Sequence, residues 1–301
     1  MKRIVATLLL ALAAPAAAQP TGFDTVQIRV ERLAPGVAML VGRGGNIGLS
    51  YGVDGNVLID DQYAPLTERI VAAIREVDPD PIRFVINTHW HGDHTGGNEN
   101  VGRTGAVIVA HDNVRRRMSM EQMVRGERVA PSPSGALPVV TFSQGITFHL
   151  NGDDIRVVHV EHAHTDGDAL VYWNRANVLH MGDTFFNGML PFIDLDSGGS
   201  TDGFIVAVEA GLALANEGTI IIPGHGPVAH RADLVRYRDM LVNLRSRVGQ
   251  GIAAGRTLEQ IKAERLADGY GPPDGFISPD ALIEAIHRSL RAAPYAEARH
   301  H

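Results

Sequence analysis

Four side chains that commonly bind metal ions fall within six consecutive positions, at His89, His91, Asp93 and His94. Successive side chains of an extended segment alternate faces, so His89 and His91 can point the same way and hold one ion. Past the flexible Gly92, Asp93 and His94 can turn toward a second ion beside the first. The alternatives are a surface histidine cluster or a hydrogen-bonded turn. The spacing favours a metal site.

The amino-acid composition limits which other kinds of site and partner the protein can have. The chain has 301 residues, 14 of them histidine, and its 45% hydrophobic and 20% charged content is that of an ordinary globular protein. It has no cysteine, which excludes disulfides, thiolate metal sites and cysteine nucleophiles. The net charge of -7 disfavours nucleic acid as a partner. A small-molecule substrate is therefore expected, and the oligomeric state is left open.

Two serine-based chemistries are excluded by context. The only lysines are Lys2 and Lys262. Position 259, three residues before Lys262, is Glu rather than Ser, so the Ser-x-x-Lys motif is absent. Gly48 to Gly52 spells Gly-x-Ser-x-Gly, but it falls inside a predicted strand. A nucleophile elbow needs a turn from strand to helix, so we interpret this match as coincidence.

The N-terminus has the three parts of an export signal. Lys2 and Arg3 are basic, Ile4–Ala14 is apolar, and small residues precede a predicted cut after Ala18. A buried N-terminal helix is the alternative. We expect residues 1–18 to be a signal peptide, residues 19–301 to form a single domain, and the protein to be periplasmic or secreted. No later stretch is apolar enough to span a bilayer.

The metal-binding motif must be positioned by the strands and helices around it. Apolar and β-branched runs in the first half predict strands over Thr25–Leu33, Val37–Val41, Ile47–Val53, Val57–Asp60, Ile82–Asn87 and Ala106–Ala110. A helix is expected from Pro65 to Pro79, and a short basic helix after Ala110. The motif therefore lies directly after the strand Ile82–Asn87, which is apolar enough to be covered on both faces.

The second half repeats this order. Strands are predicted over Val139–Phe142, Ile146–Leu150, Ile155–Val160, Ala169–Trp173, Val178–Met181 and Thr219–Ile222. Helices are predicted from Ser200 or Thr201 to about Ala215, from Ala232 to Gly249, and after Thr257 and Pro279. Two groups of strands, each followed by helices, predict an α/β fold with two packed sheets and helices outside.

Two segments are candidates to cover the site. Gly44–Asn46 is expected to be the tip of a hairpin, or a flap over the cleft. Met120–Pro138 has no regular pattern and several prolines, which predicts a loop or lid.

The motif His89-x-His91-x-Asp93-His94 resembles the signature of the metallo-β-lactamase superfamily. This resemblance implies a four-layered αββα sandwich in which two mixed β-sheets pack together with helices outside. Three later segments extend the likeness over most of the mature chain. They carry His164 in His-Ala-His-Thr-Asp-Gly-Asp, Asp183 in Gly-Asp-Thr-Phe and His225 in Pro-Gly-His-Gly-Pro.

The resemblance also implies roles for these residues. His89, His91 and His164 would hold one zinc ion, and the second would be held by Asp93, His94 and His225, with Asp183 between the two ions. Two adjacent cations lower the pKa of a shared water, so a metal-bridging hydroxide would be the nucleophile. Asp93 would orient this hydroxide and move its proton. Iron or manganese would also suit such ligands.

The implied activity is that of an exported zinc-dependent hydrolase acting on a carbonyl substrate. Hydrolysis of a β-lactam is the first prediction. Asp183 resembles the corresponding residue of the glyoxalase II and lactonase branches, so a lactone or thioester hydrolase is the alternative. A periplasmic accessory protein that binds metal without turnover is the non-enzymatic hypothesis.

Several neighbouring residues have two interpretations. His162 lies two positions before His164, but the His-Thr-x-Gly-Asp context favours His164 as the ligand. Asp60 and Asp168 either orient metal ligands or serve only as strand-end and turn residues. Trp90 is expected to pack beneath the site rather than touch substrate.

Overall fold

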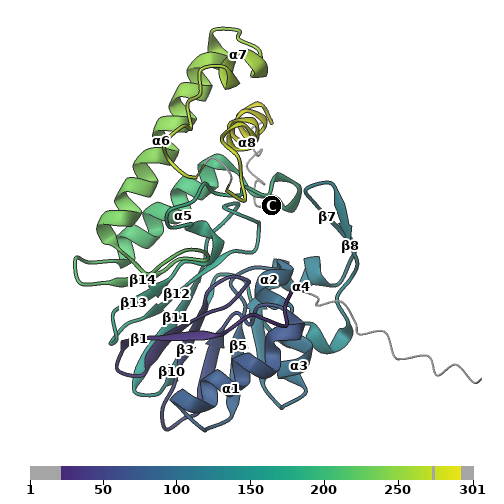
Figure 1. Ribbon diagram of the computed structural model, residues 1–301, viewed down its shortest axis with the longest axis vertical. Helices are drawn as coiled ribbons and strands as arrows, with labels where there is room; N and C mark the ends of the chain where they lie inside the picture. The colour runs from purple at the N-terminus through teal and green to yellow at the C-terminus, as the bar shows by residue number, and fades with distance from the viewer. Residues whose placement is uncertain (1–21, 273–274, 293–301) are drawn as a thin grey trace, which may run out of the picture.

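The computed structural model describes residues 22–272 and 275–292 (Figure 1). The predicted signal peptide at 1–18 lies outside these residues and stays a prediction, as does the single domain over 19–301. Within the described residues, no helix combines the length and apolar character needed to cross a membrane.

The first sheet contains seven strands, and the metal-binding motif follows one of its interior strands. Its spatial order is β1-β2-β3-β4-β5-β6-β9. The strands are β1 (Arg29–Ala34), β2 (Val37–Val41), β3 (Ile47–Ser50), β4 (Asn56–Ile59), β5 (Ile82–Ile86), β6 (Val107–His111) and β9 (Val140–Phe142). Neighbours from β1 to β4 run antiparallel, whereas β4, β5, β6 and β9 are parallel. The sheet is mixed because helical crossovers replace hairpins after β4.

The second sheet contains six strands in chain order. They are β10 (Gly145–Leu150), β11 (Asp153–His159), β12 (Ala169–Trp173), β13 (Val178–His180), β14 (Ile220–Ile222) and β15 (Ala229–His230). Only β13 and β14 pair in parallel, and α5 (Thr201–Leu214) makes the crossover between them. This sheet is therefore also mixed.

Apolar clusters separate the layers. One cluster lies between the sheets and includes Met39, Ile59, Val157 and Trp173. Another joins the first sheet to α1 (Thr67–Val77), and a third joins the second sheet to α5, α6 (Arg231–Ala253) and α8 (Pro279–Arg291). Figure 1 shows α1 and α6 on opposite sides of the strands. The predicted αββα sandwich is confirmed.

The helix predicted to end at Gly249 continues to Ala253. Glycine inside a helix costs only about 1 kcal/mol relative to alanine, so tertiary packing can override it. The true end follows the same chemistry two glycines later, because Gly255 has a φ of +72° just past the C-cap Ala254. The short helix α7 (Leu258–Lys262) then packs close to Gly251, where a Cβ would lie 2.8 Å from Ile261 Cγ1.

The sequence predicts a loop or lid over Met120–Pro138, but part of this segment is regular structure. It contains the hairpin β7 (Gln122–Val124) and β8 (Glu127–Val129), followed by the 3₁₀ turn η2 (Ser134–Ala136). Arg125 and Gly126 both have positive φ angles, 52° and 83°, as a two-residue type I′ turn requires. Strands of three residues are too short to show an alternation of apolar and polar side chains, so the sequence does not predict this hairpin.

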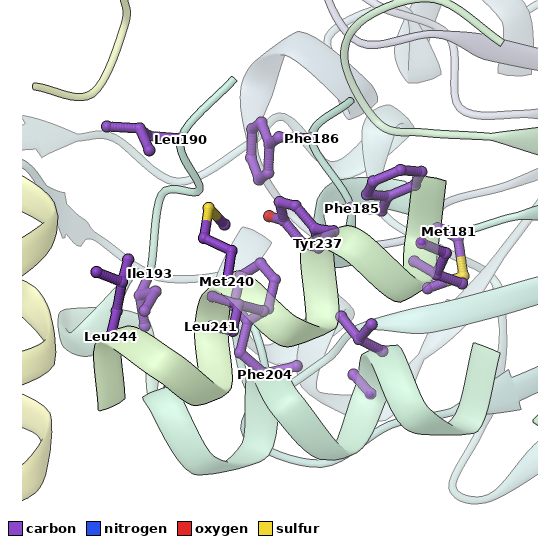
Figure 2. Packing of buried hydrophobic residues seen from close by; sticks show 14 of the residues in the cluster. Met181, Phe185, Phe186, Leu190, Ile193, Phe204, Tyr237, Met240, Leu241 and Leu244 are labelled. Carbon is purple, nitrogen blue, oxygen red and sulfur yellow. The ribbon is translucent and has the colours of Figure 1, made fainter. Parts of the chain in front are cut away.

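Replacing Phe204 with alanine should destabilise the protein by about 3–5 kcal/mol, because truncating a buried phenylalanine leaves a cavity. The Phe204 side chain is fully buried where α5 packs on α6, beside Leu241 and Tyr237 (Figure 2). Urea unfolding followed by circular dichroism measures the change. Val206→Ala on the same helix is the control, since that side chain is 60% exposed and its loss should cost under about 0.5 kcal/mol.

Candidate metal centre

The first half of the motif leaves β5 in an extended conformation. His91 then becomes the N-cap of α2 (Gly92–Thr95), a single helical turn that turns the chain back under the site. A short helix, α3 (Asn98–Gly102), follows it. The segment is anchored by Asn87 and Asn98, whose side-chain amides donate to each other at 3.0 and 2.9 Å. Strand exit and helical turn together direct the motif's side chains into one pocket.

The first cluster consists of His89, His91, His164 and Asp183, all buried, with ligand-type atoms within 4.8 Å of one another. His164 Nε2 lies 2.8 Å from His91 Nδ1. Asp183 Oδ2 lies 3.6 Å from His164 Nε2 and 3.8 Å from His89 Nε2. The strands therefore bring together the three histidines predicted to hold the first ion, although His164 is 73 residues from His91.

The second cluster consists of Asp93, His94 and His225. His225 Nε2 lies 3.4 Å from His94 Nε2 and 3.3 Å from Asp93 Oδ2. His94 is fully buried, whereas the side chains of Asp93 and His225 are 23% and 24% exposed. The centre therefore opens to solvent on the side of the second cluster.

Asp183 faces both clusters. Its Oδ1 lies 3.1 Å from His94 Nε2 and 3.4 Å from His225 Nε2, while its Oδ2 faces His89 and His164. The 3₁₀ turn η3 (Gly182–Thr184), directly after β13, presents this carboxylate. All seven predicted metal ligands therefore lie in two adjacent clusters, with Asp183 facing both.

The chemistry of the donors fits two divalent cations. His89 Nε2 is buried and has no hydrogen-bond partner, a state that costs about 1–3 kcal/mol unless another ligand satisfies the atom. In each cluster, imidazole nitrogens and carboxylate oxygens lie within 4.8 Å of one another. Such mixed nitrogen and oxygen donors suit zinc and related transition metals.

Electrostatics differ between the two clusters. Burial lowers the pKa of His164 to about 4 and that of His89 well below its usual value, so both imidazoles are neutral at pH 7, as metal ligands must be. Burial also opposes charge on His225, yet the carboxylates of Asp183 and Asp93 raise its pKa to about 9. In the metal-free protein the second cluster therefore retains a proton that a bound cation would displace.

Each of four histidines uses its second ring nitrogen for a structural partner. His91 Nε2 pairs with Asp194 at 2.9 Å, His94 Nδ1 with Asp60 at 2.7 Å, His164 Nδ1 with the Phe192 carbonyl at 2.6 Å and His89 Nδ1 with Thr88 at 3.0 Å. These contacts fix the ring orientations and leave the other nitrogen facing the pocket. Sequence reasoning missed Asp194, because no motif links it to His91, 103 residues away.

The structure also separates the earlier alternatives. Asp60 orients His94, one of its two proposed roles. Asp168 instead accepts from the backbone and hydroxyl of Thr165, both at 2.7 Å, so it shapes the turn after His164. His162 lies outside both clusters, with Nδ1 2.9 Å from the Gly198 carbonyl. Trp90 is buried and donates to Ser197, as expected for packing beneath the site.

Asp60→Asn should weaken metal binding at the second cluster by about 10–100-fold, because the carboxylate that orients His94 is lost. Competition with a chromophoric chelator measures the dissociation constants. Asp239→Asn, whose side chain is 62% exposed on α6, is the matched control. Equal affinities in both variants would show that Asp60 does not orient His94 for metal binding.

Comparisons with known proteins relate the chain to one family. Residues 40–241 match the family described as the metallo-beta-lactamase superfamily. A hydroxyacylglutathione hydrolase from Polaromonas sp. (strain JS666) is 29% identical over 166 residues, 54% of this chain and 55% of its own length. Its counterpart from Nitrosococcus oceani is 28% identical over 164 residues, with the same coverage. The chain thus spans about half the length of these curated relatives.

Solved structures show the same fold. A metallo-beta-lactamase from Pontibacter korlensis has a TM-score of 0.60 and 21% identity, covering 72% of this chain and 100% of its own. A stereoselective inverting sec-alkylsulfatase from Pseudomonas sp. has a TM-score of 0.64 and 18% identity, covering 87% of this chain and 50% of its own. At these identities the likeness concerns architecture alone.

Proposed function

The chain belongs to the metallo-beta-lactamase superfamily, and on that premise we propose that it is a metal-dependent hydrolase of a small carbonyl substrate. The observation that carries this proposal is the position of Asp183, whose two carboxylate oxygens face different clusters. A single buried carboxylate between two sets of imidazoles is the arrangement expected for a pair of adjacent cations.

Two zinc ions would occupy the centre. His89, His91 and His164 would hold the first, and Asp93, His94 and His225 the second, with Asp183 shared. Three neutral imidazoles leave an ion with an open position, as a catalytic zinc requires. Iron or manganese would also accept these donors, so the native metal depends on supply.

The protein's own side chains would handle the proton and shield the site. When bound, two adjacent cations lower the pKa of water toward neutrality and polarise a carbonyl. Burial opposes charge on Asp93, but His94 and His225 hold its pKa at about 2, so this carboxylate is ionised at neutral pH. Asp93 would orient the attacking water and relay its proton to the leaving group, and the bound cations would favour that transfer by making the water more acidic. Phe186 stacks on His225 and Phe192 on His91, which limits access of bulk water.

A thioester or lactone is the substrate class that these observations favour. The curated relatives are named as hydrolases of hydroxyacylglutathione, which is a thioester. The chain also has no cysteine, and Lys262, its one lysine among the described residues, is not among the centre's residues. A β-lactam is the second candidate, because its strained cyclic amide presents the same kind of carbonyl to the same donors.

Turnover assays would separate these substrates. Purified protein should hydrolyse a hydroxyacylglutathione thioester or a γ-lactone faster than a chromogenic cephalosporin, and a chelator should stop the reaction. The reverse preference would favour the β-lactam. A protein that binds metal but turns over none of the three, nor a phosphodiester, would be the accessory metal-binding protein instead.

Export to the periplasm or the exterior is proposed on the strength of residues 1–18 alone. If the signal is cleaved, mass spectrometry of the protein expressed from its full sequence should find Gln19 at the N-terminus, and the protein should fractionate outside the cytoplasm. An intact N-terminus on cytoplasmic protein would contradict this.

A further inference from the structure

We propose that the tip of the hairpin between β2 and β3 is a fixed brace for the second cluster, in which Gly45 and Asn46 position His94 and His225. This inference rests on the metal centre of the proposed function. Gly45 and Asn46 follow β2 of the first sheet, whereas His225 lies between β14 and β15 of the second sheet. The brace therefore connects one sheet to the loop that carries the last predicted ligand.

Asn46 holds the backbone on both sides of His225. Its backbone N–H donates to the Gly224 carbonyl at 2.7 Å. Its side-chain amide donates to the carbonyls of Pro223 and Gly226, both at 2.9 Å. The side chain is buried at 3% exposure, so water does not compete for these bonds. Three donors of one residue thus hold the backbone on both sides of His225, while the Asn187 N–H donates to the carbonyl of His225 itself at 3.0 Å.

Gly45 brings the same hairpin against the other two members of the cluster. Its N–H donates to the Asp93 carbonyl at 3.1 Å, and its own carbonyl accepts from Gln62 at 2.7 Å. A Cβ built on Gly45 would lie 2.1 Å from His94 Cε1 and 2.4 Å from its Nε2. Only glycine allows the backbone to approach the His94 ring this closely. The hairpin tip therefore contacts the His94 ring, the backbone of Asp93 and the residues on both sides of His225.

His225 depends on this support more than the other histidines do. The rings of His89, His91, His94 and His164 are each oriented through their second nitrogen. Within the described residues, the polar contacts of the His225 ring run through Nε2, toward His94, Asp93 and Asp183. The orientation of His225 is therefore set mainly by its backbone and by the stacked face of Phe186.

These contacts also distinguish a brace from a flap. A flap must leave the cleft to admit substrate, whereas this tip is joined to its surroundings by Asn46 on one side and by Gly45 and Gln62 on the other. Opening it would break buried hydrogen bonds and separate the two halves of the second cluster. The positioning role follows from the same geometry.

Cobalt titration of the metal-free protein, followed by absorbance and chelator competition, tests the brace without substrate. Asn46→Ala should raise the dissociation constant of the second site by about 10–100-fold and leave the first site unchanged. Gly45→Ala, which moves the His94 ring, should have the same site-selective effect. Asn56→Ala is the matched control, since Asn56 is also buried and its amide donates to two backbone carbonyls, at 3.4 and 2.6 Å. It lies at the start of β4, away from the cluster, and should lower stability but neither affinity.

The outcomes are distinct. If Asn46→Ala weakens cobalt binding at both sites equally, or at neither site, the inference is overturned. A wild-type protein that binds no second ion overturns the brace together with the assignment of the second cluster. Two ions bound without turnover of any substrate would leave the brace supported and overturn only the proposed hydrolase.

Discussion

Replacing Asp183 with alanine is expected to lower kcat/KM at least about 1000-fold, equivalent to about 4 kcal/mol of transition-state stabilisation. The two oxygens of this carboxylate face different clusters, and it lies close to four imidazoles. His94 and His225 hold its pKa well below the usual value although burial opposes its charge, so it is ionised at neutral pH. Its loss would remove both a shared ligand and the negative charge that offsets the cations.

Steady-state kinetics with the best substrate, together with metal analysis, would measure this effect. Asp202→Ala is the control, because the Asp202 side chain on α5 is 60% exposed and pairs with Arg245 on α6. We expect the control to retain wild-type kcat/KM. If Asp183→Ala kept more than about a tenth of the activity, Asp183 would not bridge the two sites.

Removing the metal ions should lower the unfolding temperature by about 8–16 °C. A ligand present at about 1000 times its dissociation constant stabilises the folded state by about 4 kcal/mol, and each kcal/mol shifts Tm by about 2–4 °C in a protein approaching this size. The direction follows from the structure, since buried donors such as His89 Nε2 have no hydrogen-bond partner without a cation. Thermal scans in excess zinc and in chelator would measure the shift.

A ligand-site variant separates specific binding from general effects of the chelator. His89→Ala should lose a large part of the zinc-dependent shift, while His149→Ala should keep all of it, because the His149 side chain is 75% exposed on β10. Identical unfolding temperatures for the wild type in zinc and in chelator would exclude a stabilising metal centre.

The part of the centre that is local in sequence could be predicted from residue types alone. His89, His91, Asp93 and His94 follow one strand, and the alternation of an extended segment determines which of them share a face. His164, Asp183 and His225 are far from this motif, and only the resemblance to the superfamily indicated them. The family match bears out that resemblance, and the structure brings all seven residues together.

Most of the supporting contacts could not be predicted, because they join residues far apart in the sequence and several of them involve the backbone. Asp194 binds the far side of the His91 ring, and Asn46 donates to carbonyls 177 and 180 residues away. A carbonyl leaves no trace in the residue pattern. The β7–β8 hairpin and the last turn of α6 were missed for a related reason, since short strands and interior glycines are decided by tertiary packing rather than by local preference.

Anomalous scattering from a crystal of the zinc-loaded protein, collected on both sides of the zinc edge, tests the two-metal centre most directly. Two peaks should appear, one among His89, His91 and His164 and one among Asp93, His94 and His225, with Asp183 between them. A single peak, or zinc bound only elsewhere on the protein, would contradict the account.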